Sequence, residues 1–371
     1  MKQRLWIISE LFPPDETSTS YIMGEIANAM TRKYDVGVIC GPEIYDKRKK
    51  FNKDNKFQLD SSIDIYRAVG ADLDKNTTKG KVLSFLLMSK RMMILVNSLV
   101  KKGDKVLMVT NPAPMVVLMS RLKAKVGFEL NILVHDVFPE NTRPTGLMLP
   151  FYGFFKRLFD KAYSRADQLI VLGRDMKNVM ENKLERYTHK PVYTIIENWA
   201  DIEGIQPQSF PRGKIILQYA GNIGRVQGLD KVIAQLTDDI ELHLYGTGAM
   251  EESLKKIGHP NVFFHGPYFR SQQNEVLAAC DIAVVTLQEG MYGLGVPSKT
   301  YNILASGRPV LFLGPANSEI DLLVREKNIG YCGWPEKWDK QELSAMGVRA
   351  RNVAVKDFSK ETILNKFVST I

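Results

Sequence analysis

Short hydrophobic runs alternate with longer segments of mixed polarity along the whole chain. A continuous apolar run bounded by glycine or polar residues is typical of a strand that is buried on both faces of a parallel sheet. Such runs occupy residues 4–9, 34–40, 105–110, 130–136, 168–173, 192–198, 214–221, 241–246, 261–266, 282–287 and 309–314. The segments between them are long enough for helices, so the pattern predicts an α/β fold with a doubly wound sheet in each half.

The chain of 371 residues is too long for one compact core, and a polar, proline-bearing stretch without periodicity separates the two sets of runs. We therefore predict one Rossmann-like domain over residues 1–200, a linker over 201–213 and a second Rossmann-like domain over 214–355. The last segment, 356–371, has the pattern of a single helix with Asp357 or Ser359 near its start.

The formal net charge of +9 is unevenly distributed. Residues 1–200 hold 32 Lys and Arg against 22 Asp and Glu, whereas the remaining residues hold 18 against 19. The first half therefore suits an anionic partner, either a phosphorylated substrate or an acidic membrane surface, although a solvated basic surface gives the same count. No nucleic-acid-binding module accompanies the charge, so nucleic acid is not expected as a partner.

The remaining composition favours a cytoplasmic protein. The three cysteines show neither a disulfide framework nor metal-ligand spacing, which suits a reducing compartment. No signal peptide is visible, and no apolar stretch reaches the roughly 18–20 residues that a membrane span needs.

Two predicted helices of the first half combine basic and apolar residues. In residues 82–100, Phe85, Met92 and Val96 share one face. The other side carries Leu83, Leu87, Ile94, Lys90, Arg91, Lys101 and Lys102. Burial on two sides would explain the second apolar strip, and contact with a membrane surface would explain both its apolar and its basic residues.

The second such helix falls within residues 146–165, where aromatic residues gather on one face between basic neighbours. The face consists of Phe151, Phe154, Phe155, Leu158 and Phe159, flanked by Lys156, Arg157 and Lys161. Packing into the core and a position at the headgroup level of a bilayer both fit this pattern.

A glycine-rich turn follows the first strand of the second half, in the stretch QYAGNIGRVQGLDKVI. Glycines let a backbone approach a ligand closely, and the exposed N–H groups of such a turn suit phosphate. Arg225 adds a planar cation for a diphosphate. A structural turn would use the same residues, and the absence of a following Gly-Lys-Ser/Thr rules out a P-loop.

A second candidate anion site lies in GVPSKTYNILASGRPV, residues 295–310. Ser298 is placed to cap a short helix that ends at Gly307, and Lys299 adds a cation at the helix start. An ordinary capped helix would explain each feature alone. Two such loops at the carboxyl ends of parallel strands favour a ligand site, because open α/β sheets bind ligands at that edge.

The ordered set of these motifs resembles the family 4 glycosyltransferases, with the closest likeness to the branch that builds bacterial surface polysaccharides. AGNIGRVQGLDKVI, LYGTGAMEESL, NVFFHGPY and PSKTYNILASGRPV resemble the nucleotide-sugar domain, whereas ELFPPDETSTSYIMGEIANAM, HDVFPE and IIENWAD resemble the acceptor-side domain. The resemblance implies a GT-B fold, in which two Rossmann-like domains face a central cleft and the last helix returns to the first domain. It also implies a retaining transferase that uses a nucleotide-sugar co-substrate, with no metal and no other cofactor.

The same resemblance assigns roles to residues of the second half. Asn222 and Gly224 would line the diphosphate turn, Arg225 would neutralise the leaving diphosphate, and Ser298 and Lys299 would hold the distal phosphate. The implied donor-binding set consists of Asn222, Gly224, Arg225, Gln227, Gly246, Pro267, Tyr268, Pro297, Ser298, Lys299, Thr300 and Asn302. Pro267 and Tyr268 lie where the family packs its nucleobase.

Two positions depart from the family pattern. Many relatives carry two glutamates here, and the second aligns with Asn302, which lacks the charge that strengthens a hydrogen bond to a ribose hydroxyl. The first aligns with Leu294, so we consider Glu289 as the substitute carboxylate, against the commoner case of an exposed loop glutamate. Gln227 stands where many relatives place a lysine.

The reaction needs charge neutralisation at the diphosphate more than it needs a protein nucleophile. The candidate catalytic residues are His135, Asp136, Glu289, Arg225 and Lys299. His135 and Asp136 end a predicted strand, where they would contact the transferred sugar or the acceptor hydroxyl, although a buried structural histidine is equally compatible. Asp72 and Asp74 form a D-x-D pattern, but one so short occurs by chance, and we discard it.

The sequence therefore predicts a hexosyl or N-acetylhexosaminyl transferase that uses a UDP-sugar in preference to a GDP-sugar. The expected acceptor is a polyprenyl-diphosphate-linked saccharide for O-antigen or capsule synthesis, and the enzyme would sit peripherally at the inner face of the cell membrane. Two alternatives stay open: a nucleotide-sugar epimerase on the same fold, and a non-catalytic partner in a polysaccharide assembly complex.

Overall fold

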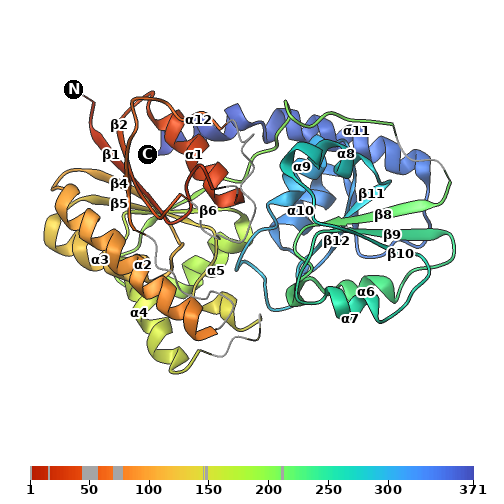
Figure 1. Cartoon of the computed structure of the whole chain (residues 1–371), viewed down its shortest axis with the longest axis horizontal. Helices are drawn as coiled ribbons and strands as arrows, with labels where there is room; N and C mark the ends of the chain where they lie inside the picture. The colour runs from red at the N-terminus through yellow and green to blue at the C-terminus, as the bar shows by residue number, and fades with distance from the viewer. Residues whose placement is uncertain are drawn as a thin grey trace.

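The computed structural model describes residues 2–15, 17–43, 57–69, 78–144, 146, 149–209 and 213–371. The discarded Asp72 and Asp74 lie outside these described residues, as do parts of the predicted linker and of the 146–165 segment. Two α/β units stand side by side, each built on its own parallel sheet (Figure 1).

The first unit has a seven-stranded sheet in the order β3-β2-β1-β4-β5-β6-β7, and every printed pairing is parallel. Its strands are β1 (Arg4–Ser9), β2 (Asp35–Cys40), β3 (Asp64–Arg67), β4 (Lys105–Val109), β5 (Glu129–Val134), β6 (Gln168–Val171) and β7 (Val192–Ile195). The order reverses between β1 and β4, as in Rossmann folds, which bind ligands beyond the carboxyl ends of the strands at this point.

The second unit repeats this order in a six-stranded parallel sheet, β10-β9-β8-β11-β12-β13. Its strands are β8 (Ile215–Ala220), β9 (Ile240–Tyr245), β10 (Val262–Gly266), β11 (Ile282–Thr286), β12 (Val310–Leu313) and β13 (Gly330–Cys332). The prediction of two doubly wound α/β units is therefore confirmed.

Helices cover both faces of each sheet (Figure 1). In the first unit they are α1 (Ser18–Met30), α2 (Thr78–Leu99), α3 (Pro114–Val126), η1 (Glu140–Thr142), α4 (Tyr152–Ser164) and α5 (Arg174–Leu184). In the second they are η2 (Arg225–Gln227), α6 (Leu229–Ile233), α7 (Glu251–Lys255), η3 (Arg270–Gln272), α8 (Gln273–Ala278), α9 (Lys299–Ala305), α10 (Glu319–Lys327) and α11 (Lys340–Asp357). The last helix is α12 (Lys360–Thr370).

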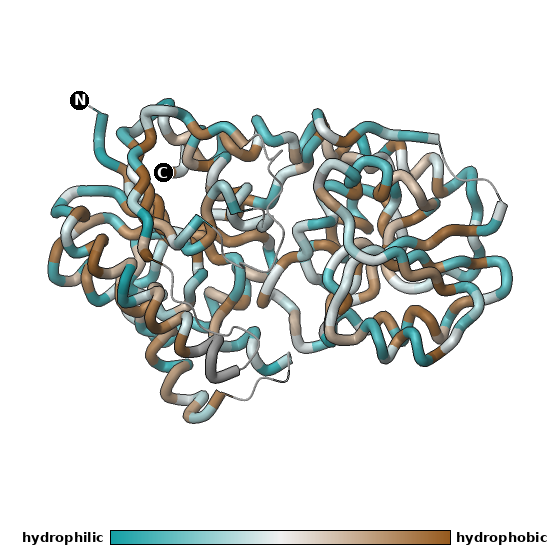
Figure 2. The backbone as a smooth tube through the Cα atoms, viewed as in Figure 1, coloured by the Kyte–Doolittle hydropathy of each residue, from teal (hydrophilic) through white to brown (hydrophobic). Residues whose placement is uncertain are grey.

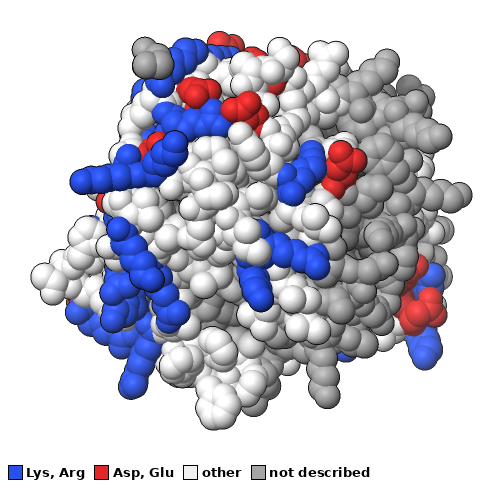
Figure 3. Space-filling view, turned by 60° about the vertical axis from the view of Figure 1, so that its left-hand side comes forward, with Lys and Arg blue, Asp and Glu red and all other residues white. Residues whose placement is uncertain are grey.

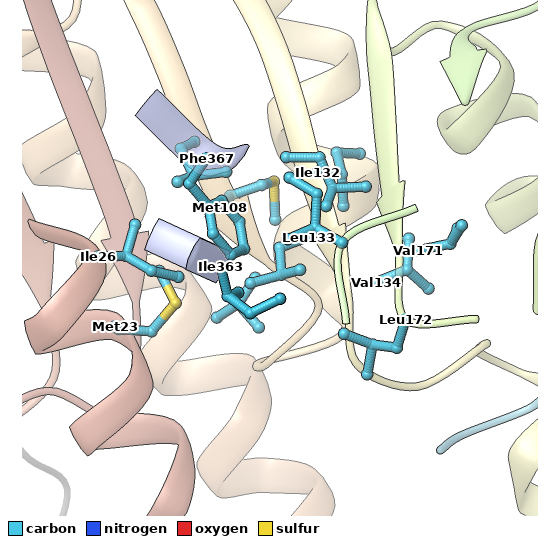
Figure 4. Close-up of a cluster of buried hydrophobic side chains, with 14 of the residues drawn as sticks. Met23, Ile26, Met108, Ile132, Leu133, Val134, Val171, Leu172, Ile363 and Phe367 are labelled. Carbon is cyan, nitrogen blue, oxygen red and sulfur yellow. The ribbon is translucent and has the colours of Figure 1, made fainter. Parts of the chain in front are cut away.

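The core lies between each sheet and its helices, because the strands are apolar on both faces. Figure 2 shows hydrophobic stretches along the central strands and hydrophilic stretches on the outer loops. In the first unit, Met23 and Ile26 of α1 face Met108 and Leu133 of the sheet in one buried cluster (Figure 4). Helix α12 contributes Ile363 and Phe367 to the same cluster, so the end of the chain is part of the core of the first unit.

The chain crosses between the units twice, at neighbouring places. Ala200, which follows β7, forms an isolated parallel bridge with Ser359, which follows α11. Ser359 caps α12 by accepting a hydrogen bond from the N–H of Thr362, as the sequence predicts. Helices α11 and α12 run along the upper edge in Figure 1 and bring the carboxyl terminus back to the unit that holds the amino terminus.

The basic and apolar helix α2 is buried on one side only. Met92 and Val96 are buried as predicted, but Leu83 is 48% exposed and Ile94 is 62% exposed. The interpretation that the protein buries both apolar sides of this helix is therefore wrong for Leu83 and Ile94. The strip lies at the surface.

The predicted aromatic face of α4 is only partly buried. Phe159 is buried and Phe155 and Leu158 are half-buried, whereas Phe151 and Phe154 are 83% and 64% exposed. Within the described residues, none of the helices is long and apolar enough to cross a membrane.

Candidate functional site

A cleft of about 580 Å³ lies between the two units at the carboxyl ends of their strands. His135 and Asp136 follow β5 on one side, and Gly221 and Asn222 follow β8 on the other. The described residues that line it are Ser18, Thr19, Tyr21, Ile22, His135, Asp136, Leu172, Asn198, Trp199, Asp201, Tyr219, Ala220, Gly221, Asn222, Gln227, Tyr268, Gln273, Thr286, Leu287, Met291, Gly295, Val296, Pro297, Ser298, Lys299 and Asn302. The structure thus brings together the loops that sequence analysis singled out in both halves.

Lys299 is the principal cation of this cleft. Its Nζ atom lies 3.4 Å from the ring centroid of Tyr219, within range of a cation–π interaction. The same atom lies 3.5 Å from the position that a Cβ on Gly221 would take, so it sits against the glycine turn. Loss of hydration on burial lowers the pKa of Lys299 to about 7. An anion bound at the turn would therefore stabilise the charged form of Lys299.

The turn after β8 is held in place by backbone contacts. The Tyr219 hydroxyl donates to the carbonyl of Asn222 at 2.8 Å, and the N–H of Gly221 donates to the carbonyl of Tyr245 at the same distance. A Cβ on Gly246 would lie 1.9 Å from the carbonyl oxygen of Gly221, and Gly246 has a positive φ of 126°. Gly246 therefore supports the turn by close packing and does not itself line the cleft.

Asn302 has a partner within the protein. Its Oδ1 accepts a hydrogen bond of 2.9 Å from the backbone N–H of Asp201, so helix α9 is tied to the crossing segment after β7. Asn302 also lines the cleft, where its amide N–H groups are donors. A glutamate at this position would offer only acceptors when ionised, so the asparagine reverses the polarity of the contact that the family pattern implies.

His135 and Asp136 present different chemistry to the cleft. Both backbone N–H groups donate to the Thr110 hydroxyl, at 3.2 and 3.3 Å, which fixes the end of β5. Burial lowers the pKa of His135 to about 4, and no described residue hydrogen-bonds its buried Nε2 atom. The ring is therefore neutral at physiological pH.

Asp136 keeps an open surface to the cleft, but the protein around it removes much of its hydration. This desolvation raises the pKa of its carboxyl group above the ordinary range. A Cβ on Gly295 would lie 3.3 Å from its Oδ1 atom, so the carboxylate faces the loop that leads to Lys299.

Gln227 and Tyr268 occupy the second unit's side of the cleft. The Oε1 atom of Gln227 is buried and has no hydrogen-bond partner among the described residues. Tyr268 packs edge-on against Tyr245, with ring centroids 6.3 Å apart, and burial raises the pKa of its hydroxyl. An aromatic wall of this kind suits a nucleobase.

Six of the predicted site residues do not line the cleft: Gly224, Arg225, Gly246, Pro267, Glu289 and Thr300. Arg225 and Glu289 are exposed on their loops, and Thr300 is fully buried with its hydroxyl unpaired among the described residues. Ser298 is the N-cap residue of α9, as predicted, but its side chain makes no capping hydrogen bond. With seven residues α9 has a weak dipole, so Lys299 is the main source of positive charge there.

Direct contacts also join the two units. The guanidinium of Arg174, at the start of α5, forms ion pairs with Glu319 at 3.0 Å and Glu326 at 2.8 Å, both on α10. The N–H of Val137 donates to the carbonyl of Leu294 at 3.0 Å. His135 and Asp136 therefore have a defined position relative to the loop that leads to Lys299.

Sequence analysis missed several lining residues, among them Thr19, Tyr219 and Gln273. Thr19 lies in the first turn of α1, in a stretch that carries the family resemblance, so that signal was available. Tyr219 lies inside the apolar run of β8, where nothing in the pattern separates a ligand contact from a core residue. The described residues contain no group of three His, Cys, Asp or Glu that could hold a metal ion.

Comparison with known proteins assigns a class to this site. Residues 217–330 match the sequence profile of the family described as Glycosyl transferases group 1. The chain is 29% identical over 411 residues to probable glycosyltransferase WbjE of Pseudomonas aeruginosa, covering 99% of this chain and 97% of the relative. It is 28% identical over 193 residues to putative colanic acid biosynthesis glycosyl transferase WcaI of Escherichia coli K12, covering 46% and 47%.

Solved structures give the fold. A sucrose-phosphate synthase of Thermosynechococcus elongatus superposes with a TM-score of 0.75 at 12% identity, over 100% of this chain and 98% of that chain. Anabaena HepE in complex with UDP superposes with a TM-score of 0.63 at 13% identity, over 100% and 99%. These likenesses confirm the predicted GT-B fold, and the sequence matches support the enzyme class of a glycosyltransferase.

Proposed function

We propose that this protein is a retaining glycosyltransferase that moves a sugar from UDP to a lipid-linked saccharide during the synthesis of a bacterial surface polysaccharide. The observation that carries the proposal is the position of Lys299, half-buried under the glycine turn after β8 and facing the cleft between the two units.

The chemistry follows from where charge develops. Breaking the bond between sugar and diphosphate leaves negative charge on the diphosphate and positive charge on the sugar ring. Preorganised cations and N–H groups lower such a barrier most when they sit in a poorly solvated site. Lys299 meets this condition at the turn, and Arg225 would reach the diphosphate from the exposed loop beside it. In this mechanism Lys299 and Arg225 neutralise the leaving diphosphate, and no metal ion is used.

The transferred sugar would lie between the turn and the end of β5. Asp136 faces the loop before Lys299, so its carboxylate would oppose the positive charge of the sugar ring. The neutral His135 ring would border the same space. Retention of configuration fits a front-face reaction, in which the acceptor attacks the sugar on the same face from which the diphosphate departs.

The choice of UDP is supported by the aromatic wall at Tyr268 and by the fold neighbour HepE, whose structure holds UDP. The polysaccharide assignment is supported by WcaI, which is described as a putative colanic acid biosynthesis glycosyl transferase. The exposed apolar strip of α2 and the aromatic start of α4, among basic residues, favour a peripheral position at the inner face of the cell membrane.

A ligand-binding screen tests the donor assignment first. The melting temperature is measured with UDP, GDP and their sugars for the wild type, for Lys299→Ala and for the control Lys231→Ala on the exposed face of α6. We expect a stabilising shift with UDP that is lost in Lys299→Ala and kept in the control. A shift with GDP alone contradicts the UDP assignment, and equal shifts in both variants contradict the site.

The reaction is then followed with radiolabelled UDP-sugars and a membrane extract as the source of acceptor. Label that enters the lipid fraction supports transfer. Conversion of the free UDP-sugar into its epimer, with no lipid product, supports an epimerase instead.

A further inference from the structure

A second, larger cavity of about 1160 Å³ lies between α2, α3 and α4. Its walls are mainly apolar. They include Phe85 and Met93 from α2, Leu118 from α3, and Phe155 and Leu158 from α4. A cavity of this size exceeds the roughly 300–1,000 Å³ of ordinary small-ligand sites. Such a volume, left open next to a buried core, calls for an apolar occupant.

The cavity adjoins the cleft. Thr19, His135 and Asp136 line both spaces, so one end of the apolar groove begins where the sugar would be transferred. This shared end is polar, since Asn111 and Asn141 also line it. An occupant must therefore carry hydroxyl groups at one end and hydrocarbon at the other.

The other end opens at the surface. Leu86 and Ile94 line the groove and are 53% and 62% exposed, so they form its rim. The exposed Phe151 and Phe154 stand at the start of α4, and the Phe154 ring contacts the Phe155 ring of the groove wall, with centroids 5.6 Å apart. A hydrocarbon chain could leave the groove here past apolar side chains.

The rim also carries positive charge. Lys90 is the one Lys or Arg among the described residues that line the groove, and it lies one helical turn from both Leu86 and Ile94. It forms no ion pair with a described carboxylate. Figure 3 turns the left-hand side of Figure 1 forward, and on its described part Lys and Arg side chains lie around an uncharged surface.

We infer that this groove holds the polyprenyl chain of the acceptor lipid, which enters past the rim formed by Leu86 and Ile94, with its diphosphate and saccharide at the polar end near His135. The inference rests on the proposed function, which it deepens by assigning the lipid a place. A polyprenyl-diphosphate saccharide carries its polar groups at one end and hydrocarbon at the other, and the groove presents polar residues at one end, apolar walls along its length and an exposed rim. A bilayer phospholipid has no sugar hydroxyl to reach Asp136.

Crosslinking tests the inference without requiring transfer. A polyprenyl diphosphate with a photoreactive group on its chain is irradiated with the full-length protein in detergent, and crosslinked peptides are identified by mass spectrometry. We expect crosslinks in α2, α3 and α4. Unlabelled polyprenyl diphosphate should compete for the groove, whereas phosphatidylglycerol should not.

Two variants fill the groove at half-buried positions, Leu118→Trp and Leu158→Trp, and Val348→Trp places the same residue on an exposed position of α11. Excluding a few methylene groups from an apolar site weakens binding by about tenfold or more, so crosslinking should fall by that factor in both groove variants and not in the control. The thermal shift with UDP should be unchanged in all three, which shows that they fold.

Two results overturn the inference: crosslinks that spread over the surface regardless of the tryptophans, or equal competition by phosphatidylglycerol, which would make the groove a site for bilayer lipid. Failure of the proposed function looks different. In that case UDP gives no thermal shift, whereas the groove crosslinks and their loss in Leu118→Trp persist.

Discussion

The ammonium group of Lys299 lies 3.4 Å from the centre of the Tyr219 ring, directly beside the glycine turn that ends β8. This contact joins two segments about 80 residues apart in the sequence, the first strand of the second unit and the first residue of α9. A ring face stabilises a cation without neutralising it, so the charge stays available to a ligand. The pKa of about 7 shows that the apo site holds this charge weakly.

Removing the ammonium group should weaken UDP binding strongly. A hydrogen bond to a charged group contributes about 1.5–3 kcal/mol, so we expect Lys299→Met to lower UDP affinity by about 10- to 100-fold. Isothermal titration calorimetry measures the change, with Lys231→Met as the control. Equal affinities in Lys299→Met and the wild type would contradict the diphosphate assignment.

The same lysine should make UDP binding depend on pH. Above about pH 7 the free protein holds Lys299 mostly neutral, and a bound diphosphate favours the charged form, so binding takes up a proton. UDP affinity should therefore fall as the pH rises above about 7, while below it Lys299 is already protonated and adds no dependence. Calorimetry at pH 8 in buffers of different ionisation enthalpy measures the proton uptake, which should be absent in Lys299→Met.

The strands, the succession of two α/β units along the chain and the glycine turn could be predicted from the sequence. They follow from local apolar patterns and from the backbone freedom of glycine. Contacts made across the chain could not. No pattern shows that Asn302 bonds to the backbone of Asp201, or that the apolar side of α2 with Leu86 and Ile94 borders a groove. Arg225 and Glu289 carry the expected chemistry but stand on exposed loops, because a motif fixes a residue's neighbours in sequence and not its distance from a cleft.

Asn302 should have separable effects on stability and on nucleotide binding. Asn302→Ala leaves the N–H of Asp201 without its acceptor, which costs about 1–3 kcal/mol, whereas Asn302→Asp keeps an oxygen in place. We expect the melting temperature to fall in the alanine variant and to stay nearly unchanged in the aspartate variant.

If Asn302 contacts the ribose, the alanine variant loses affinity for UDP and keeps its affinity for the 2′,3′-dideoxy analogue, whereas the aspartate variant, whose carboxylate can accept from a ribose hydroxyl, is affected less. A loss of equal size for both nucleotides would show that the effect is on the fold of the site and not on the ribose.

Gln227 stands at a position where a cation would help. Its Oε1 atom is buried in the cleft wall without a described partner, so Gln227→Lys should improve UDP binding by several-fold through added charge at the turn. The same change should lower the melting temperature without UDP, because a second ammonium group near Lys299 is desolvated and repelled. The control is Gln227→Met, which matches the size without the charge; an equal gain in affinity there would refute the electrostatic explanation.

Asp136 should govern the pH dependence of turnover on the acid side. Desolvation raises the pKa of this carboxyl group, and the ionised form is the one that opposes positive charge on the sugar, so kcat should fall as the pH falls through the raised pKa. His135 should add no step between pH 5 and 8, since its pKa is lowered to about 4 and its ring stays neutral there.

Asp136→Asn should remove the acid limb and lower kcat by about 100-fold or more, in the range typical of a positioned catalytic carboxylate, while UDP affinity is retained. Asp238→Asn, on an exposed turn of the second unit, is the matched control. An acid limb that survives in Asp136→Asn would assign the titration to another group and remove Asp136 from the mechanism.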